Sequence, residues 1–204
     1  MFALVNKSDN SITKFLNGKI GITLDGIQHP KAIFSLWTEA ERNAINIYTV
    51  EMDNSKKKNE EWYNNTNVTY AFDGSKVTGS YGDATAKAHA DTLFTAQDES
   101  DGKGTEGDVK DEGLKTKLIR SIKSQAEGEL NKTDWYITRK AEKDTAIPSA
   151  VSTHRDAVRS KQAEMETAIT NASDTPALET LYTYTTQEDG STTRPLGELP
   201  TKDF

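Results

Sequence analysis

The N-terminal part of the chain carries short apolar runs separated by turn-forming residues, which is typical of β-structure. The runs Phe2–Val5 and Ile12–Leu16 flank the polar cluster Asn6–Asn10, and this arrangement favours a hairpin. Ile20–Leu24 alternates apolar with small or polar residues and stops at Asp25-Gly26, a strong turn dipeptide. The chain is therefore predicted to begin with three strands.

A short helix and two more strands are predicted next. Thr38 and Glu41 have the spacing of a capping box, in which each side chain satisfies a free backbone N–H at a helix start, so we predict a helix to about Asn46. Val68–Tyr81 predicts a strand, a turn at Asp73-Gly74 and a second strand. A further helix over Ala84–Phe94 would complete a mixed α/β module spanning residues 1–94.

The segment 95–113 shows no hydrophobic period. Its Gly and acidic residues cannot bury enough apolar surface to offset the entropy of ordering the backbone. We predict an acidic, Gly-rich linker here, with the domain boundary inside it. Its clustered carboxylates suggest a Ca²⁺ loop, but their spacing fails the EF-hand pattern, which favours a solvated linker.

Residues 114–181 have helical periodicity, and three helices are predicted within them. The first carries apolar residues every four positions from Leu114 to Leu130. The second begins at Asp134 and ends before Pro148, and the third repeats apolar residues every seven positions after Pro148. A short helix from Asp174 to Leu181 follows. The predicted core of this module comprises Leu118, Ile122, Trp135, Ile137, Val151, Val158 and Met165.

The whole pattern predicts an α+β protein. A small β-rich N-terminal module is followed by a C-terminal helical hairpin or three-helix bundle, because each helix has one apolar face to bury. An irregular tail is expected over residues 182–204, where Pro and polar residues interrupt the pattern. On the second helix, Arg139 and Glu142 have the spacing of an exposed ion pair.

Composition narrows the function classes. Among 204 residues, 34% are apolar and 28% charged, with a net charge of −7, so electrostatic attraction to nucleic acid or an anionic membrane is not expected. Cys is absent, which excludes disulfides, thiol nucleophiles and thiolate metal sites. No apolar run is long enough to predict insertion into a membrane.

Candidate chemistry is sparse. His29, His89 and His154 are far apart in sequence and lack a metal-binding pattern such as HExxH. The paired carboxylates lie in polar runs, and no Ser lies in a Gly-X-Ser-X-Gly elbow. We predict no catalytic residue, no cofactor and no metal. The candidate interaction residues are aromatic, namely Trp62 and Tyr63 in a polar stretch, together with Tyr81.

The C-terminal half resembles a module of bacteriophage tail-fibre-assembly-like proteins. The matching residues are the string DWYITRKAE over 134–142, then Ile147-Pro148 with Val151, and Arg155 with Arg159. They are similar to a family pattern DWYxxRxAE, IPxxV, RxxxR. The stretch from Trp37 to Val50 resembles the front part of the same proteins, but Asn46 stands where Gly is more usual.

This resemblance implies a non-enzymatic tail protein that binds tail-fibre or baseplate proteins. It would act in the host cytoplasm as a fibre-assembly factor, or remain in the virion tail as an adaptor or structural component, with self-association open. The alternative is a receptor-binding module for host surface glycans, with Trp62, Tyr63 and Tyr81 as sugar platforms. Enzymatic hydrolysis of cell-wall glycan is a third class without a supporting motif.

Overall fold

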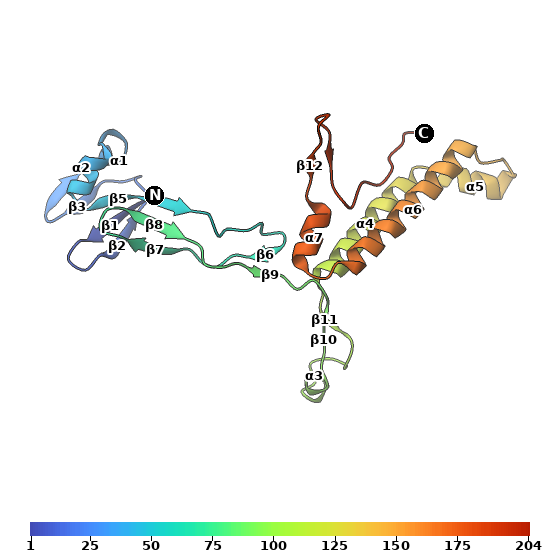
Figure 1. The fold of residues 1–204 in the computed structure, drawn as a ribbon, viewed down its shortest axis with the longest axis horizontal. Helices are drawn as coiled ribbons and strands as arrows, with labels where there is room; N and C mark the ends of the chain where they lie inside the picture. The colour runs from blue at the N-terminus through green and yellow to red at the C-terminus, as the bar shows by residue number, and fades with distance from the viewer. The chain divides into compact units, whose positions relative to one another are not determined.

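The chain divides into two units, Met1–Thr85 and Ala86–Phe204, in a computed structural model that describes all of residues 1–204. The first unit is built mainly of strands and the second mainly of helices (Figure 1). This confirms the predicted α+β class. The division lies before the predicted linker, since residues 95–113 belong to the second unit.

A curled five-stranded sheet in the order β2-β1-β5-β8-β7 forms the first unit. The predicted first hairpin is β1 (Phe2–Asn6) with β2 (Ser11–Leu16), and β1 also pairs antiparallel with β5 (Ile47–Asp53). The predicted strand, turn and strand are β7 (Thr69–Phe72) and β8 (Val77–Ser80), and β8 runs parallel to β5. The buried core on this sheet comprises Ala3, Val5, Tyr48, Phe72 and Val77.

Two predicted local features of this unit are confirmed. The third strand is β3 (Ile22–Leu24), which turns at Asp25-Gly26 into β4 (Ile27–His29). Helix α2 (Glu39–Ala44) has the Thr38–Glu41 capping box, with both reciprocal hydrogen bonds present. The remaining short elements here are α1 (Ile33–Leu36), β6 (Tyr63–Asn64) and β9 (Thr85–Ala86), and β6 pairs with β9.

Asn46 connects α2 to β5 in a left-handed conformation, with φ of 61°. Its carbonyl oxygen accepts a hydrogen bond from Val5 N–H at 3.0 Å, so the turn is fixed to strand β1. Only Gly, and to a lesser extent Asn and Asp, adopts this conformation readily. Asn46 is therefore one of the few residue types that can occupy this turn at little conformational cost.

The predicted helix over Ala84–Phe94 is wrong. The segment instead passes through β9 and ends in β10 (Thr92–Leu93), and its backbone caps α4 (Leu114–Asn131). Leu114 N–H donates to Ala88 O at 2.9 Å, and Lys115 N–H donates to His89 O at 3.0 Å. A long-range contact therefore replaces the local hydrogen bonds that a helix would have made.

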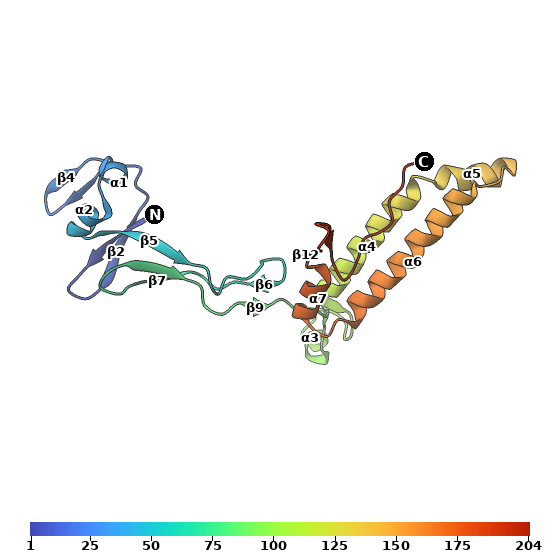
Figure 2. The same ribbon diagram turned by 45° about the horizontal axis from the view of Figure 1, so that its top comes forward.

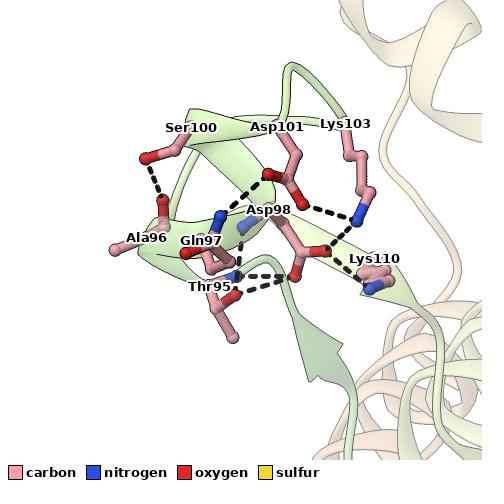
Figure 3. A network of polar contacts seen from close by, with 8 residues as sticks. All are labelled: Thr95, Ala96, Gln97, Asp98, Ser100, Asp101, Lys103 and Lys110. Atoms are coloured by element: carbon pink, nitrogen blue, oxygen red, sulfur yellow. Dashed lines mark hydrogen bonds and ion pairs between the residues drawn. The ribbon is translucent and has the colours of Figure 1, made fainter.

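The predicted linker contains ordered secondary structure. β10 pairs with β11 (Val109–Asp111), and α3 (Ala96–Ser100) lies between them. Thr95 and Asp98 form a capping box at the start of α3, and Lys110 donates to Asp98 at 3.0 Å (Figure 3). We call residues 92–111 the β10–β11 excursion. The linker prediction rests on the scarcity of apolar residues, whereas hydrogen bonds and ion pairs largely hold this excursion in place.

Acid is expected to loosen this excursion. Hydrogen bonds from Thr95 N–H and from Lys110 lower the pKa of Asp98 from 3.8 to about 2. Because the folded pKa is depressed, the contribution of this carboxylate to stability is complete above about pH 4 and disappears as the pH falls towards 2. Amide hydrogen exchange of residues 95–110 should therefore accelerate over this range. The Asp98→Asn variant should exchange faster at neutral pH and lack most of the added acid sensitivity.

Helices α4 and α6 (Ser149–Asn171) form an antiparallel hairpin and lie side by side (Figures 1 and 2). Both apolar stripes predicted from the sequence are used, since Ile122, Val151, Val158 and Met165 are at most 1% exposed. Leu118 is half-buried. Helix α7 (Thr175–Tyr182) has Asp174 as its N-cap, as predicted, and its buried Thr175 hydroxyl donates to Lys87 O at 2.6 Å.

The tail after α7 is more regular than predicted. β12 (Thr185–Thr186) and β13 (Thr192–Thr193) form a small hairpin. Leu196 is 2% exposed, and its N–H donates to Leu181 O at 3.0 Å. The Arg194 guanidinium stacks on Tyr182 of α7, and the Phe204 ring lies 5.2 Å from the His154 ring of α6, so several contacts attach this polar tail to the helical unit.

Candidate interaction surface on helix α5

Helix α5 (Asp134–Lys143) connects α4 to α6 at the end of the hairpin opposite α7 (Figures 1 and 2). It begins shortly after α4 ends and stops at Asp144, which is in the left-handed conformation. No residue of α5 is fully buried. The helical unit is therefore a two-helix hairpin with a short cross-connection, which is the first of the two predicted architectures.

The predicted core positions on α5 are wrong. The exposed fractions of Trp135 and Ile137 are 51% and 42%. The sequence already indicates that these side chains cannot all be buried, because Trp135, Tyr136 and Ile137 are consecutive and span roughly 200° around a helix. Three consecutive helical residues cannot all pack against one neighbouring helix. No residue of α5 is fully buried by the rest of the unit.

Trp135, Tyr136 and Arg139 form a stacked cluster, which we call the α5 cluster. The two rings have their centroids 3.7 Å apart at an interplanar angle of 32°. The Arg139 guanidinium lies 4.7 Å from the Trp135 ring centroid and 5.2 Å from that of Tyr136. Side chains on a helix lean towards its N-terminus, which brings Arg139 over the two aromatic residues that precede it by one turn.

The predicted ion pair between Arg139 and Glu142 does not form. The structure contains no carboxylate within ion-pair distance of Arg139. Its Nε is buried without a hydrogen-bond partner. The guanidinium stacks on the two rings instead, and the cluster combines an aromatic surface with an unpaired cation.

Arg155 of α6 holds α5 in place. Its side chain is 8% exposed, and Nη1 donates to Leu130 O at 2.7 Å, to Thr133 Oγ1 at 2.8 Å and to Asp134 Oδ1 at 2.7 Å. One cation thus satisfies the end of α4 and the start of α5 together. The sequence indicates Arg155 only as part of the RxxxR resemblance and gives no sign of these partners, which are 21 to 25 residues away.

Removing this guanidinium should destabilise the junction between α4 and α5. Arg155→Ala leaves the hydroxyl of fully buried Thr133 and the Leu130 carbonyl without this donor, which should lower the free energy of unfolding by about 2 kcal/mol. Urea denaturation followed by circular dichroism measures this loss. Arg159→Ala on the same helix is the matched control, because Arg159 makes only an exposed ion pair with Asp156 and should change stability little. Equal effects of the two substitutions would contradict the role of Arg155.

The three interaction residues predicted in the first unit have a different environment. Trp62 and Tyr63 are buried, with exposed fractions of 2% and 5%, which is incompatible with open sugar platforms. Backbone N–H groups of both residues donate to Asn59 O, so the turn folds them inward. Only Tyr81 is partly exposed, with Lys57 Nζ 5.7 Å from its ring centroid. The surface aromatic prediction overlooked this turn.

Neither unit assembles a group of metal-binding side chains. No cluster of three or more His, Asp or Glu side chains is placed to hold a metal ion. The first unit has a hollow of about 430 Å³ whose lining includes Leu4, Ile27 and Ile45, with Asp25 and His29 as its titratable side chains. An open groove of about 690 Å³ follows α6 and is lined largely by polar residues. The α5 cluster is therefore the most distinctive surface feature.

No protein-family model matches this chain, and comparisons with curated proteins and with solved structures found no match. Among its helices, none combines the length and the apolar character needed to cross a membrane.

Proposed function

We propose that this chain is a non-enzymatic bacteriophage tail protein that binds tail-fibre or baseplate proteins through the α5 cluster. The observation that carries the proposal is the exposure of Trp135 within the string DWYITRKAE, on which the resemblance to tail-fibre-assembly-like proteins chiefly rests. A motif that served only the core would bury its Trp. Exposed Trp, Tyr and Arg residues are instead the residue types that anchor protein interfaces.

The rest of the helical unit supports an interface at this position. Ile137 adds a second exposed apolar side chain to the same short helix. The buried Arg155 network fixes the start of α5, so the surface is preorganised and binding would cost little ordering entropy. A preorganised aromatic surface suits an adaptor or assembly factor, which needs complementarity to a partner and no chemistry.

The role is tested with the proteins encoded beside this chain. Tagged full-length protein is co-expressed with each tail-fibre and baseplate protein of the same genome, and the purified complexes are analysed by mass and stoichiometry. The proposal predicts a defined complex with at least one of them. A chain that binds none of them, in lysate or in particles, would contradict it.

Quantitative mass spectrometry of purified virions and infected-cell lysate separates the two forms of the proposal. Stoichiometric presence in the particle indicates an adaptor or structural component of the tail. Abundance in lysate with absence from particles indicates an assembly factor acting in the host cytoplasm.

The Trp135→Ala variant is expected to lose the partner and keep its fold. Because the side chain is 51% exposed and stacks on Tyr136 and Arg139, its removal should cost about 1 to 2 kcal/mol in the free energy of unfolding, less than for a buried Trp. Thermal denaturation and co-purification measure the two effects. Tyr184→Ala is the control, since Tyr184 is 53% exposed elsewhere on the same unit and should leave partner binding intact. If Trp135→Ala retains partner binding, the interface does not lie on α5.

A further inference from the structure

Arg139 is a stacked cation whose hydrogen-bonding groups are largely unused. Its guanidinium is held over two rings, and no ion pair or hydrogen bond to another side chain occupies it. Lys143, four residues later on the same side of α5, also forms no ion pair. A chain with a net charge of −7 thus carries two unpaired cations beside an aromatic surface. Lys143 is exposed, whereas Arg139 is half-buried and its Nε is buried, so its Nη groups are the donors open to a partner.

The same chain contains a second arginine stacked on two aromatic rings, and that arginine also pairs with a carboxylate. The Arg194 guanidinium lies 5.1 Å from the Tyr182 ring centroid and 5.2 Å from that of Tyr184. Its Nε and Nη2 each lie 2.8 Å from an oxygen of the Glu198 carboxylate. The Tyr184 hydroxyl donates to the same carboxylate at 2.5 Å. An acidic side chain is therefore what this arrangement binds within the molecule.

We propose that the α5 cluster binds a carboxylate side chain of an acidic peptide segment in the partner protein. The proposal rests on the proposed function and specifies the chemistry of the partner. A planar guanidinium offers parallel N–H donors that match the two oxygens of a carboxylate. Stacking on Trp135 and Tyr136 limits its motion, so less entropy is lost when an anion binds.

The neighbouring side chains define the segment further. Ile137 and the exposed part of Trp135 offer apolar contacts next to the cation. A fitting segment therefore places Asp or Glu beside an apolar residue. Lys140 already pairs with Asp144 at 2.5 Å, so the anion is expected to depend on Arg139, with a smaller contribution from Lys143.

A library of random peptides selected on the full-length protein tests this chemistry. Enriched peptides should share an Asp or Glu next to an apolar residue. For a synthetic representative, replacing that acid by its amide, or Arg139 by Gln, should weaken binding at least about tenfold in a fluorescence titration. Arg139→Lys should recover only part of the affinity, because Lys keeps the charge and loses the paired donors. Lys140→Gln is the matched control and should bind as the unaltered protein does.

Enrichment of peptides without acids, unchanged binding to Arg139→Gln, or no enrichment at all would each overturn the carboxylate site. Circular dichroism of Arg139→Gln verifies that a loss of binding does not reflect unfolding. The library contains no tail protein, so it can succeed where co-purification with fibre or baseplate proteins fails. A tail-protein complex that Trp135→Ala abolishes and Arg139→Gln leaves unchanged would retain the proposed function and reject the carboxylate site.

Discussion

Ile122→Ala is expected to lower the free energy of unfolding of the helical unit by about 3 kcal/mol. The Ile122 side chain is 1% exposed on the face of α4 that packs against α6, and truncation leaves a cavity that two helices in one layer cannot readily close. Few other buried residues compensate, because α4 contributes only Leu114, Ile122 and Ala126 to the fully buried set.

Urea denaturation monitored by circular dichroism at 222 nm, where helices dominate the signal, measures this loss. Hydrogen exchange assigns it to residues 114–171 and should leave the sheet of the first unit unaffected. Ile137→Ala provides the same chemical change at a position that is 42% exposed and should alter stability by no more than about 0.5 kcal/mol. Similar losses for the two variants would show that α4 and α6 do not pack through Ile122.

Gly113→Ala is expected to have a comparable effect for a different reason. A Cβ at this position would lie 2.3 Å from the carbonyl carbon and 2.4 Å from the carbonyl oxygen of Ala90, which are backbone atoms that cannot rotate away. The Gly113 φ of −76° is open to any residue, so the restriction is one of space. Either α4 or the segment 88–91 must move.

That movement would break the cap of α4. Asp91 accepts hydrogen bonds from Gly113 N–H at 2.7 Å and from the Thr116 hydroxyl at 2.8 Å, and Ala88 and His89 accept those of the first helical residues. Losing this set and relieving the clash should cost about 3 kcal/mol. Thermal denaturation measures the cost, with Gly128→Ala as the control, because its Cβ meets nothing within 4 Å and Ala favours a helix interior. A neutral Gly113→Ala would mean that the segment and α4 are not in this contact.

The clearest revision from sequence to structure concerns α5. Periodicity identified the helix, but it could not show whether α5 lay in a bundle or outside one. The helical pattern places Trp135 in the predicted core, but its exposed fraction is 51%. That change supports the proposed interaction surface, because Trp135 lies where a partner can contact it.

For residues 92–111 the error is the opposite one, because the sequence predicts less order than the structure has. Its composition suggested a solvated linker, since it holds few apolar residues. Hydrogen bonds to Asp98 and strand pairing order it instead. Counting apolar surface underestimates segments whose polar groups satisfy one another, because the favourable terms then depend on geometry that composition does not contain.

The sequence by itself determined the elements whose signals are local. Hydrophobic periods located α4 and α6, the Thr38–Glu41 spacing located α2, and turn dipeptides located the end of β3 and the β7–β8 hairpin. Each of these signals depends on residues a few positions apart. Tertiary structure alone decided the burial of Trp62, the exposure of Trp135, the role of Arg155 and the capping of α4 by residues 88–91. Those outcomes depend on which distant backbone or side-chain groups share one space, and local spacing carries no information about that.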